Sequence, residues 1–132
     1  MIVLDASCVV ELAIGTPLGR AVAARIANPA QGLHVPHLVD VEVAQAMRRL
    51  VRDGEMDAMG AAAALGILHD LDLERHAHEP LLDRVWSLRG SLSAYDAVYL
   101  ALAEALDSRL LTCDRRLARA PGMSRRVELI AP

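Results

Sequence analysis

Four acidic residues lie where their side chains could together hold divalent metal ions: Asp5, Glu42, Asp96 and Asp114. Asp5 ends the apolar run 1–4, and Asp114 follows the apolar stretch 110–113 closely. If the four carboxylates converge, they repel one another, and a divalent cation stabilises the cluster at neutral pH. Mg²⁺ and Mn²⁺ prefer carboxylate and water oxygens. Either ion can orient water and stabilise the charge that develops on a phosphate.

Alternating strand and helix patterns predict the elements that must position these acids. We expect short strands at residues 2–4, 33–35, 71–76, 109–112 and 127–130. We expect helices at residues 7–14, 18–27, 38–52, 55–69, 80–88 and 93–106, with a helical turn after Asp114. This order favours an α/β fold in which helices cover both faces of a parallel sheet. Ligands bind such sheets at the carboxyl ends of the strands, where Asp5 and Asp114 fall.

Apolar spacing also predicts how three helices pack. In helix 38–52 we expect Val43, Met47 and Leu50 to face the core. In helix 55–69 the expected packing residues are Met56, Met59, Ala63 and Ile67. Helix 93–106 is apolar almost all round, which indicates burial on several sides.

Each acid also has an alternative interpretation as an ordinary structural residue. Asp5 and Asp114 could cap the helices that follow them. The segment from Ser93 to Asp96 has the pattern of a capping box, with Asp in place of Glu. Glu42 shares a helical stripe with polar residues and could lie on a solvated face. The set of four is harder to explain this way, because a parallel sheet brings such junctions together.

Composition excludes several other classes of protein. A chain of 132 residues with a net charge of −3 fits one domain, residues 1–132, and argues against a basic nucleic-acid coat protein. All 14 basic residues are arginine. The absence of lysine argues against phosphoaspartate receivers, haloacid-dehalogenase-like phosphatases and P-loop nucleotide binding. No stretch is long and apolar enough for a membrane span, and no signal peptide precedes the first strand, so we expect a cytoplasmic protein.

The remaining polar and aromatic residues give weaker predictions. Cys8 and Cys113 form no CxxC pair, and we expect buried free thiols. The histidine pairs 34/37 and 76/78 have no acidic or cysteine partner that completes a zinc signature, so we expect no zinc site. Trp86 is most simply a residue of the core or of a dimer contact.

Several motifs together resemble the PIN-domain ribonucleases, and most closely the VapC toxins of bacterial toxin–antitoxin pairs. The motifs are Asp-Ala-Ser at 5–7, Pro-His-Leu-Val-Asp-Val-Glu-Val-Ala at 36–44, Ala-Tyr-Asp-Ala-Val-Tyr at 94–99 and Leu-Leu-Thr-Cys-Asp-Arg-Arg-Leu-Ala at 110–118. The resemblance spans residues 2 to about 130. It implies a PIN-like three-layer α/β/α sandwich with a central parallel sheet.

The resemblance assigns roles to individual residues. The family's four acids match Asp5, Glu42, Asp96 and Asp114, which would bind Mg²⁺ or Mn²⁺ and carry catalysis. Ser7 and Thr112 match its supporting hydroxyls. Beside the fourth acid, Arg115, Arg116 and Arg119 belong to a basic segment that could contact RNA phosphates or simply be solvated.

The activity implied is that of an endoribonuclease toxin of a VapBC module. It would cleave structured RNA such as tRNA or rRNA with a metal-activated water and leave a 5′-phosphate. The implied partners are a VapB-type antitoxin, the RNA substrate and a second copy of the chain. Two alternatives remain open: a catalytically silent PIN-like protein-binding module, and a PIN nuclease that acts without an antitoxin.

Overall fold

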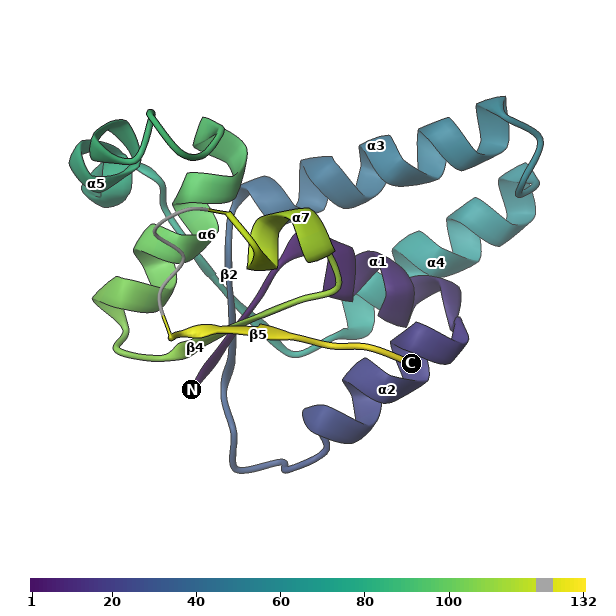
Figure 1. The fold of residues 1–132 in the computed structure, drawn as a ribbon. Coiled ribbons are helices and arrows are strands. Elements are labelled where there is room, and N and C mark those ends of the chain that lie inside the picture. The colour runs from purple at the N-terminus through teal and green to yellow at the C-terminus, as the bar shows by residue number, and fades with distance from the viewer. Residues whose placement is uncertain (121–124) are drawn as a thin grey trace.

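Five parallel strands form the centre of the computed structural model, which describes residues 1–120 and 125–132. The strands are β1 (Ile2–Leu4), β2 (Leu33–Pro36), β3 (Leu73–His76), β4 (Arg109–Thr112) and β5 (Val127–Leu129). Their order across the sheet is β3-β2-β1-β4-β5, and all pairs are parallel. The central strand β1 therefore lies between β2 and β4, which brings distant parts of the chain together (Figure 1). The expected parallel α/β architecture is confirmed.

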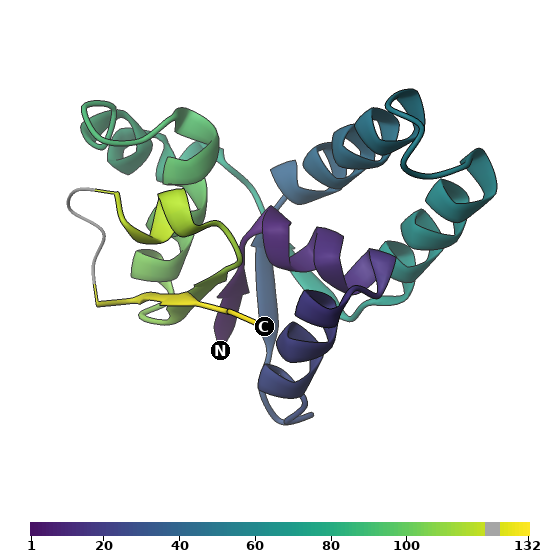
Figure 2. The same cartoon turned by 45° about the vertical axis from the view of Figure 1, so that its right-hand side comes forward.

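Helices lie on both sides of this sheet (Figures 1 and 2). On one side α1 (Ala6–Ile14) packs with α2 (Pro17–Arg25), α3 (Leu38–Arg52) and α4 (Ala58–Asp70). On the other side lie the 3₁₀ turn η1 (Glu79–Leu81), α5 (Leu82–Ser87) and α6 (Ala94–Ala105). The short helix α7 (Arg115–Ala118) follows β4. Helices α3 and α4 extend side by side away from the sheet (Figures 1 and 2).

The core forms where α6 crosses the central strands. Every residue of β1 is at most 1% exposed, as expected for a strand that is covered on both faces. The residues of α6 from Ala97 to Ala103 are all buried, and this helix contacts β1, β2 and β4. The prediction that this helix is buried on several sides is confirmed. Its burial fixes the first turn of α6, which carries Asp96.

The turn between α1 and α2 depends on two glycines. Gly15 ends α1 in the left-handed region at φ 78°, where a side chain is unfavourable. Thr16 then caps α2, and its hydroxyl accepts a hydrogen bond from the backbone N–H of Gly19. A Cβ atom at Gly19 would lie 2.0 Å from the carbonyl oxygen of Glu11. This close approach lets α2 fold back onto the end of α1, whose first turn carries Ser7.

The packing of α3 matches its sequence pattern, whereas that of α4 does not. Val43 and Met47 are buried and Leu50 is partly buried, as predicted. The predicted helix 55–69 begins only at Ala58, because the side chain of Asp57 caps it by accepting from the N–H of Gly60.

Most of the predicted packing side of α4 is also wrong, although Met56, just before the helix, is partly buried against the core as predicted. Met59 is 83% exposed and Ile67 is 44% exposed, while Ala64 and Leu68 are buried instead. The helix is apolar on most sides, so its composition could not indicate which side faces the protein.

Several other boundaries also differ from the predictions; the helix predicted at 18–27, for example, is α2 (Pro17–Arg25). The predicted strand 71–76 begins at Leu73, and the predicted helix 80–88 is divided into η1 and α5. Trp86 is 68% exposed with the guanidinium of Arg89 over its ring, so its interpretation as a core residue is wrong.

Among the described residues no single helix is long and apolar enough to cross a membrane. By length and composition only the pair α1 and α2 qualifies together, and that pair is bent by 115°.

Candidate active site

The four predicted acids come from four different elements at the carboxyl end of the sheet. Asp5 directly follows β1, and Asp114 lies two residues beyond β4. The backbone N–H of Asp5 donates to the carbonyl of Leu111, which keeps these two strand ends adjacent. Glu42 lies early in α3, the helix after β2, and Asp96 lies in the first turn of α6. The parallel topology therefore gathers them as predicted.

Asp5 is the buried centre of the site. It is 6% exposed, and its Oδ2 accepts hydrogen bonds from Ser7 Oγ at 2.6 Å and Thr112 Oγ1 at 2.8 Å. Burial raises the pKa of Asp5, and the charge of Asp96 adds to this effect, while the two hydroxyl donors oppose it. Although Asp5 precedes α1, its side chain makes no capping hydrogen bond. The interpretation of Asp5 as a side-chain cap is therefore wrong.

Ser7 and Thr112 connect Asp5 to the segment that carries Asp114. Each hydroxyl donates to Asp5 and also accepts a backbone N–H. Ser7 Oγ accepts from the N–H of Cys113 at 2.9 Å, and Thr112 Oγ1 accepts from the N–H of Asp114 at 3.0 Å. The two hydroxyls therefore hold Asp5 and the backbone beside Asp114 in a fixed relation.

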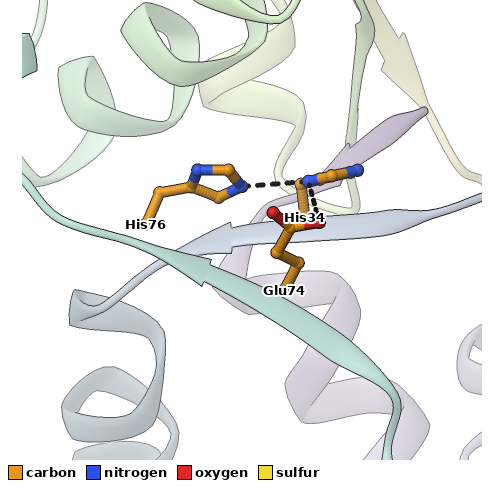
Figure 3. Close-up of side chains that lie close together, drawn as sticks. All are labelled: His34, Glu74 and His76. Atoms are coloured by element: carbon orange, nitrogen blue, oxygen red, sulfur yellow. Dashed lines mark hydrogen bonds and ion pairs between the residues drawn. The ribbon is translucent and has the colours of Figure 1, made fainter.

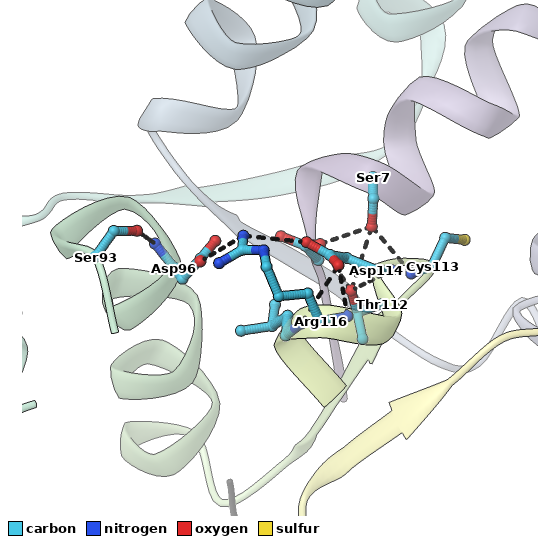
Figure 4. A network of polar contacts seen from close by, with 9 residues as sticks. Ser7, Ser93, Asp96, Thr112, Cys113, Asp114 and Arg116 are labelled. Atoms are coloured by element: carbon cyan, nitrogen blue, oxygen red, sulfur yellow. Dashed lines mark hydrogen bonds and ion pairs between the residues drawn. The ribbon is translucent and has the colours of Figure 1, made fainter. Parts of the chain in front are cut away.

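One arginine lies between the other two aspartates. Arg116 Nη2 lies 3.2 Å from Asp96 Oδ2 and 3.3 Å from Asp114 Oδ2 (Figure 4). The two negative charges raise the pKa of Arg116, whose side chain is 75% exposed. Since one nitrogen reaches both carboxylates, the gap between Asp96 and Asp114 accommodates a positive charge.

The capping interpretations of Asp96 and Asp114 are partly right. Asp114 Oδ1 caps α7 by accepting from the backbone N–H groups of Arg116 and Leu117 at 2.8 and 3.3 Å. Ser93 caps α6 through the N–H of Asp96 at 3.2 Å. The carboxylate of Asp96, however, bonds to Arg116. Capping therefore coexists with the convergence of the acids.

Glu42 is tied to α6 through a buried tyrosine. Tyr99 is 0% exposed, and its hydroxyl donates to Glu42 Oε1 at 2.6 Å. Burial raises the pKa of Glu42, the hydrogen bond from Tyr99 opposes this, and the charges of Asp5 and Asp96 add to the rise. The interpretation of Glu42 as a solvated residue is therefore wrong. The sequence analysis gave Tyr99 no role. Its place three residues after Asp96 in the same motif was the available signal.

The donor set fits a small divalent cation. All the acids offer oxygen, and two of them have raised pKa values because burial and mutual repulsion penalise their charge. In the part of the chain that the structure describes, only His34, Glu74 and His76 bring three ligand atoms within 4.8 Å of one another. The four acids are therefore more widely spaced. Mg²⁺ tolerates such spacing, because it keeps several waters and takes few protein ligands.

The arginines that follow Asp114 in the sequence lie in two places. Arg115 and Arg119 are exposed on α7, beside the acids, while Arg116 turns toward them. Arg125 and Arg126 lie before β5, at the opposite end of the sheet, where Arg126 pairs with Asp107 at 2.8 Å. Only the first three are therefore placed for contact with a substrate at the acids.

The two cysteines face each other beside this network. The Sγ atoms of Cys8 and Cys113 lie 3.6 Å apart, and both thiols are free. The free-thiol prediction is confirmed, with Cys8 buried and Cys113 only half-buried.

The statement that the histidines lack an acidic partner is wrong, because Glu74 lies with His34 and His76. Glu74 was missed because it reaches His34 only through strand pairing.

A three-layer parallel α/β sandwich with acids at the carboxyl ends of its central strands defines a nuclease-like class of protein. The family model for the PIN domain matches residues 2–123. The ribonuclease VapC12 of Mycobacterium tuberculosis is 41% identical to this chain over 132 residues, which cover 99% of this chain and 100% of the relative. The chain therefore belongs to the PIN domain family.

Solved structures agree on the fold. A toxin–antitoxin complex from Klebsiella pneumoniae contains a chain that matches with a TM-score of 0.68 at 15% identity, covering 99% of this chain and 98% of that one. The Mycobacterium tuberculosis toxin VapC20, described as cleaving the sarcin–ricin loop, matches with a TM-score of 0.65 at 16% identity, covering 89% and 93%.

Proposed function

We propose that this protein is a divalent-metal-dependent endoribonuclease, the toxin of a VapBC-type pair. The observation that carries the proposal is the convergence of Asp5, Glu42, Asp96 and Asp114 at one end of the sheet. Membership of the PIN domain family and 41% identity to a VapC ribonuclease support the reaction class. We further propose that the substrate is structured RNA, in line with the sarcin–ricin loop that VapC20 cleaves.

The four acids would hold Mg²⁺ or Mn²⁺ among their carboxylates. When bound, such an ion lowers the pKa of water and stabilises the charge that develops on the phosphate. Asp5 is held in place by Ser7 and Thr112, so its charged oxygen needs no reorganisation during the reaction. Glu42 is held in the same way by Tyr99.

Arg116 would exchange partners when an ion binds. It already neutralises Asp96 and Asp114, and its exposed side chain is free to swing away from them. Once displaced, it would join Arg115 and Arg119 beside the site, where guanidinium groups bind phosphate oxygens. We therefore propose that α7 contacts the RNA backbone next to the cleaved bond.

The proposed partners are an antitoxin and a second copy of this chain. Large apolar side chains remain on the surface, where an antitoxin or a second protomer could cover them. Val41 is 68% exposed, Tyr95 64% and Trp86 68%. The Klebsiella complex supports the antitoxin partner, since a chain of the same fold occurs there in a toxin–antitoxin assembly.

The test is cleavage of cellular RNA by purified protein with Mg²⁺, with mapping of the new 5′ ends. Asp5→Asn, Asp96→Asn and Asp114→Asn should each lower the rate at least about a hundredfold, as when a group that stabilises transition-state charge is lost. Asp70→Asn makes the same change at a side chain that is 85% exposed on α4, and it should cleave at the wild-type rate. Full activity in two of the three site variants would disprove the shared site.

A further inference from the structure

A second group of metal-ligating side chains lies away from the four acids, on β2 and the edge strand β3. It consists of His34, Glu74 and His76 (Figure 3). His34 and Glu74 are direct partners in the parallel register, and His76 lies two residues after Glu74 on the same face of β3. Strand pairing therefore places all three side chains on one face of the sheet.

Three ligand atoms converge on one point in this group. His34 Nδ1 lies 2.9 Å from His76 Nε2 and 3.5 Å from Glu74 Oε2. The ligand atoms of all three residues lie within 4.8 Å of one another. Around tetrahedral zinc, with bonds of about 2.0 to 2.1 Å, ligand atoms are spaced about 3.3 Å apart. The spacings of 2.9 Å and 3.5 Å from His34 Nδ1 are therefore close to those of a zinc site.

The surroundings favour a built site over a chance encounter of surface groups. The side chain of His34 is only 7% exposed, and its other ring nitrogen, Nε2, packs over Gly32, where a Cβ atom would lie 3.0 Å away. Glu74 is 68% exposed, so one side of the group faces solvent. The neighbouring His78 does not join the group, because its Nε2 accepts the backbone N–H of Leu38.

We propose that His34, Glu74 and His76 bind a transition metal ion, with Zn²⁺ as the best candidate. Two imidazoles and one carboxylate suit Zn²⁺, whereas the all-oxygen acidic site suits Mg²⁺ or Mn²⁺. Three protein ligands leave a fourth position for water on the exposed side. The ion would cross-link the edge strand β3 to β2, whose far end leads into α3 and Glu42. This proposal does not depend on the nuclease function.

The test is a titration of the chelator-treated protein with Zn²⁺, followed by calorimetry, in excess Mg²⁺ so that the acids are occupied. We expect one equivalent to bind and to raise the melting temperature. A parallel titration with Co²⁺ should give the visible absorption of a tetrahedral site. Wild-type protein that binds neither ion would overturn the proposal.

Variants assign the ion to its ligands. His76→Gln and Glu74→Gln should each weaken Zn²⁺ binding at least about tenfold, since even outer-shell changes cost ten- to a hundredfold. His69→Gln, at a side chain that is 90% exposed on α4, should not. Asp96→Asn should also bind Zn²⁺ normally, and loss of binding there would place the ion at the acids instead. Circular dichroism shows whether His76→Gln folds. Glu74→Gln changes an exposed group, so unchanged binding in this variant alone would contradict its role.

Discussion

At the scale of single residues, the site is a balance of negative charge and its few compensating groups. Asp5 is stabilised by two hydroxyls, Glu42 by one, and Asp96 and Asp114 by the shared guanidinium of Arg116. Of these compensating groups, Arg116 alone carries charge. It therefore determines how strongly a cation in solution is attracted to the two half-buried aspartates, Asp96 and Asp114.

Replacing Arg116 should alter metal and RNA binding in opposite directions. In Arg116→Gln, the positive charge between Asp96 and Asp114 is lost, so Mg²⁺ should bind about two- to fivefold more tightly, the scale of an exposed ion pair. RNA should bind more weakly, because a phosphate contact is lost. Calorimetry measures the first effect and a filter-binding assay measures the second.

Arg119→Gln is the matched control, since it removes the same charge from the end of α7. It should weaken RNA binding but leave Mg²⁺ affinity almost unchanged. If both variants bind Mg²⁺ equally, Arg116 does not occupy the cation position in solution.

At the scale of elements, the contact between α3 and α6 positions the site across the sheet. Glu42 belongs to α3 and Tyr99 to α6, and their hydrogen bond is 2.6 Å long. Tyr99 is fully buried, so its hydroxyl has no access to bulk water. A change at this one oxygen should therefore affect both the stability of the protein and the orientation of Glu42.

Tyr99→Phe should lower the free energy of unfolding by about 1.5 to 3 kcal/mol, the range for a hydrogen bond to a charged acceptor. Phenylalanine keeps the ring and its packing, so the loss reports on the hydroxyl. The pKa of Glu42 should rise further, since the hydrogen bond favours its charged form.

Urea denaturation measures the effect, with Tyr95→Phe as control. Tyr95 lies in the same helix but is 64% exposed, and its loss of a hydroxyl should change stability little. Equal stability of wild type and Tyr99→Phe would show that the bond to Glu42 contributes nothing to folding.

Sequence periodicity predicted correctly those elements whose hydrophobic pattern fits only one way of packing. The strands around Val3 and Leu110 are short apolar runs, and α3 has one clear stripe through Val43 and Met47. The packing side predicted for α4 was wrong, because this helix has apolar residues on most sides. Its contacts with α1 and α3 determine which side is buried, and they leave Met59 exposed.

For the site, the acids could be predicted because parallel strands bring their carboxyl ends together. Their compensating partners could not. The reach of Arg116 to Asp96, and that of Tyr99 to Glu42, depend on how α7, α6 and α3 pack. The group of His34, Glu74 and His76 was missed for the same reason, since register across β2 and β3 is not visible in a single strand.

At the scale of the whole molecule, the proposed antitoxin would compete with metal for the same carboxylates. We predict that it inserts a basic side chain among the four acids, as Arg116 already does between two of them. An arginine fits because its forked donors match carboxylates. Inhibition of RNA cleavage should then weaken as Mg²⁺ is raised.

Replacing that antitoxin arginine with alanine should restore part of the nuclease activity while the complex persists. Cleavage assays on the purified complex across a Mg²⁺ series measure this, and size-exclusion chromatography confirms that the complex remains. Inhibition that is indifferent to both Mg²⁺ and the substitution would show that silencing works by covering the site from outside.

The central position of β1 has a consequence for the order in which the protein is made. β1 is translated before the other strands of the sheet, yet its register partner on one side is β4, with Leu4 opposite Leu111. Contacts so distant in sequence form late and slowly. The hydrogen bond from Thr112 to Asp5 therefore cannot form during the early part of translation. Thr112 and Asp114 are translated more than a hundred residues after Asp5. A chain that ends before β4 carries Asp5, Glu42 and Asp96 but lacks Thr112 and Asp114, so its site stays incomplete until translation has passed them.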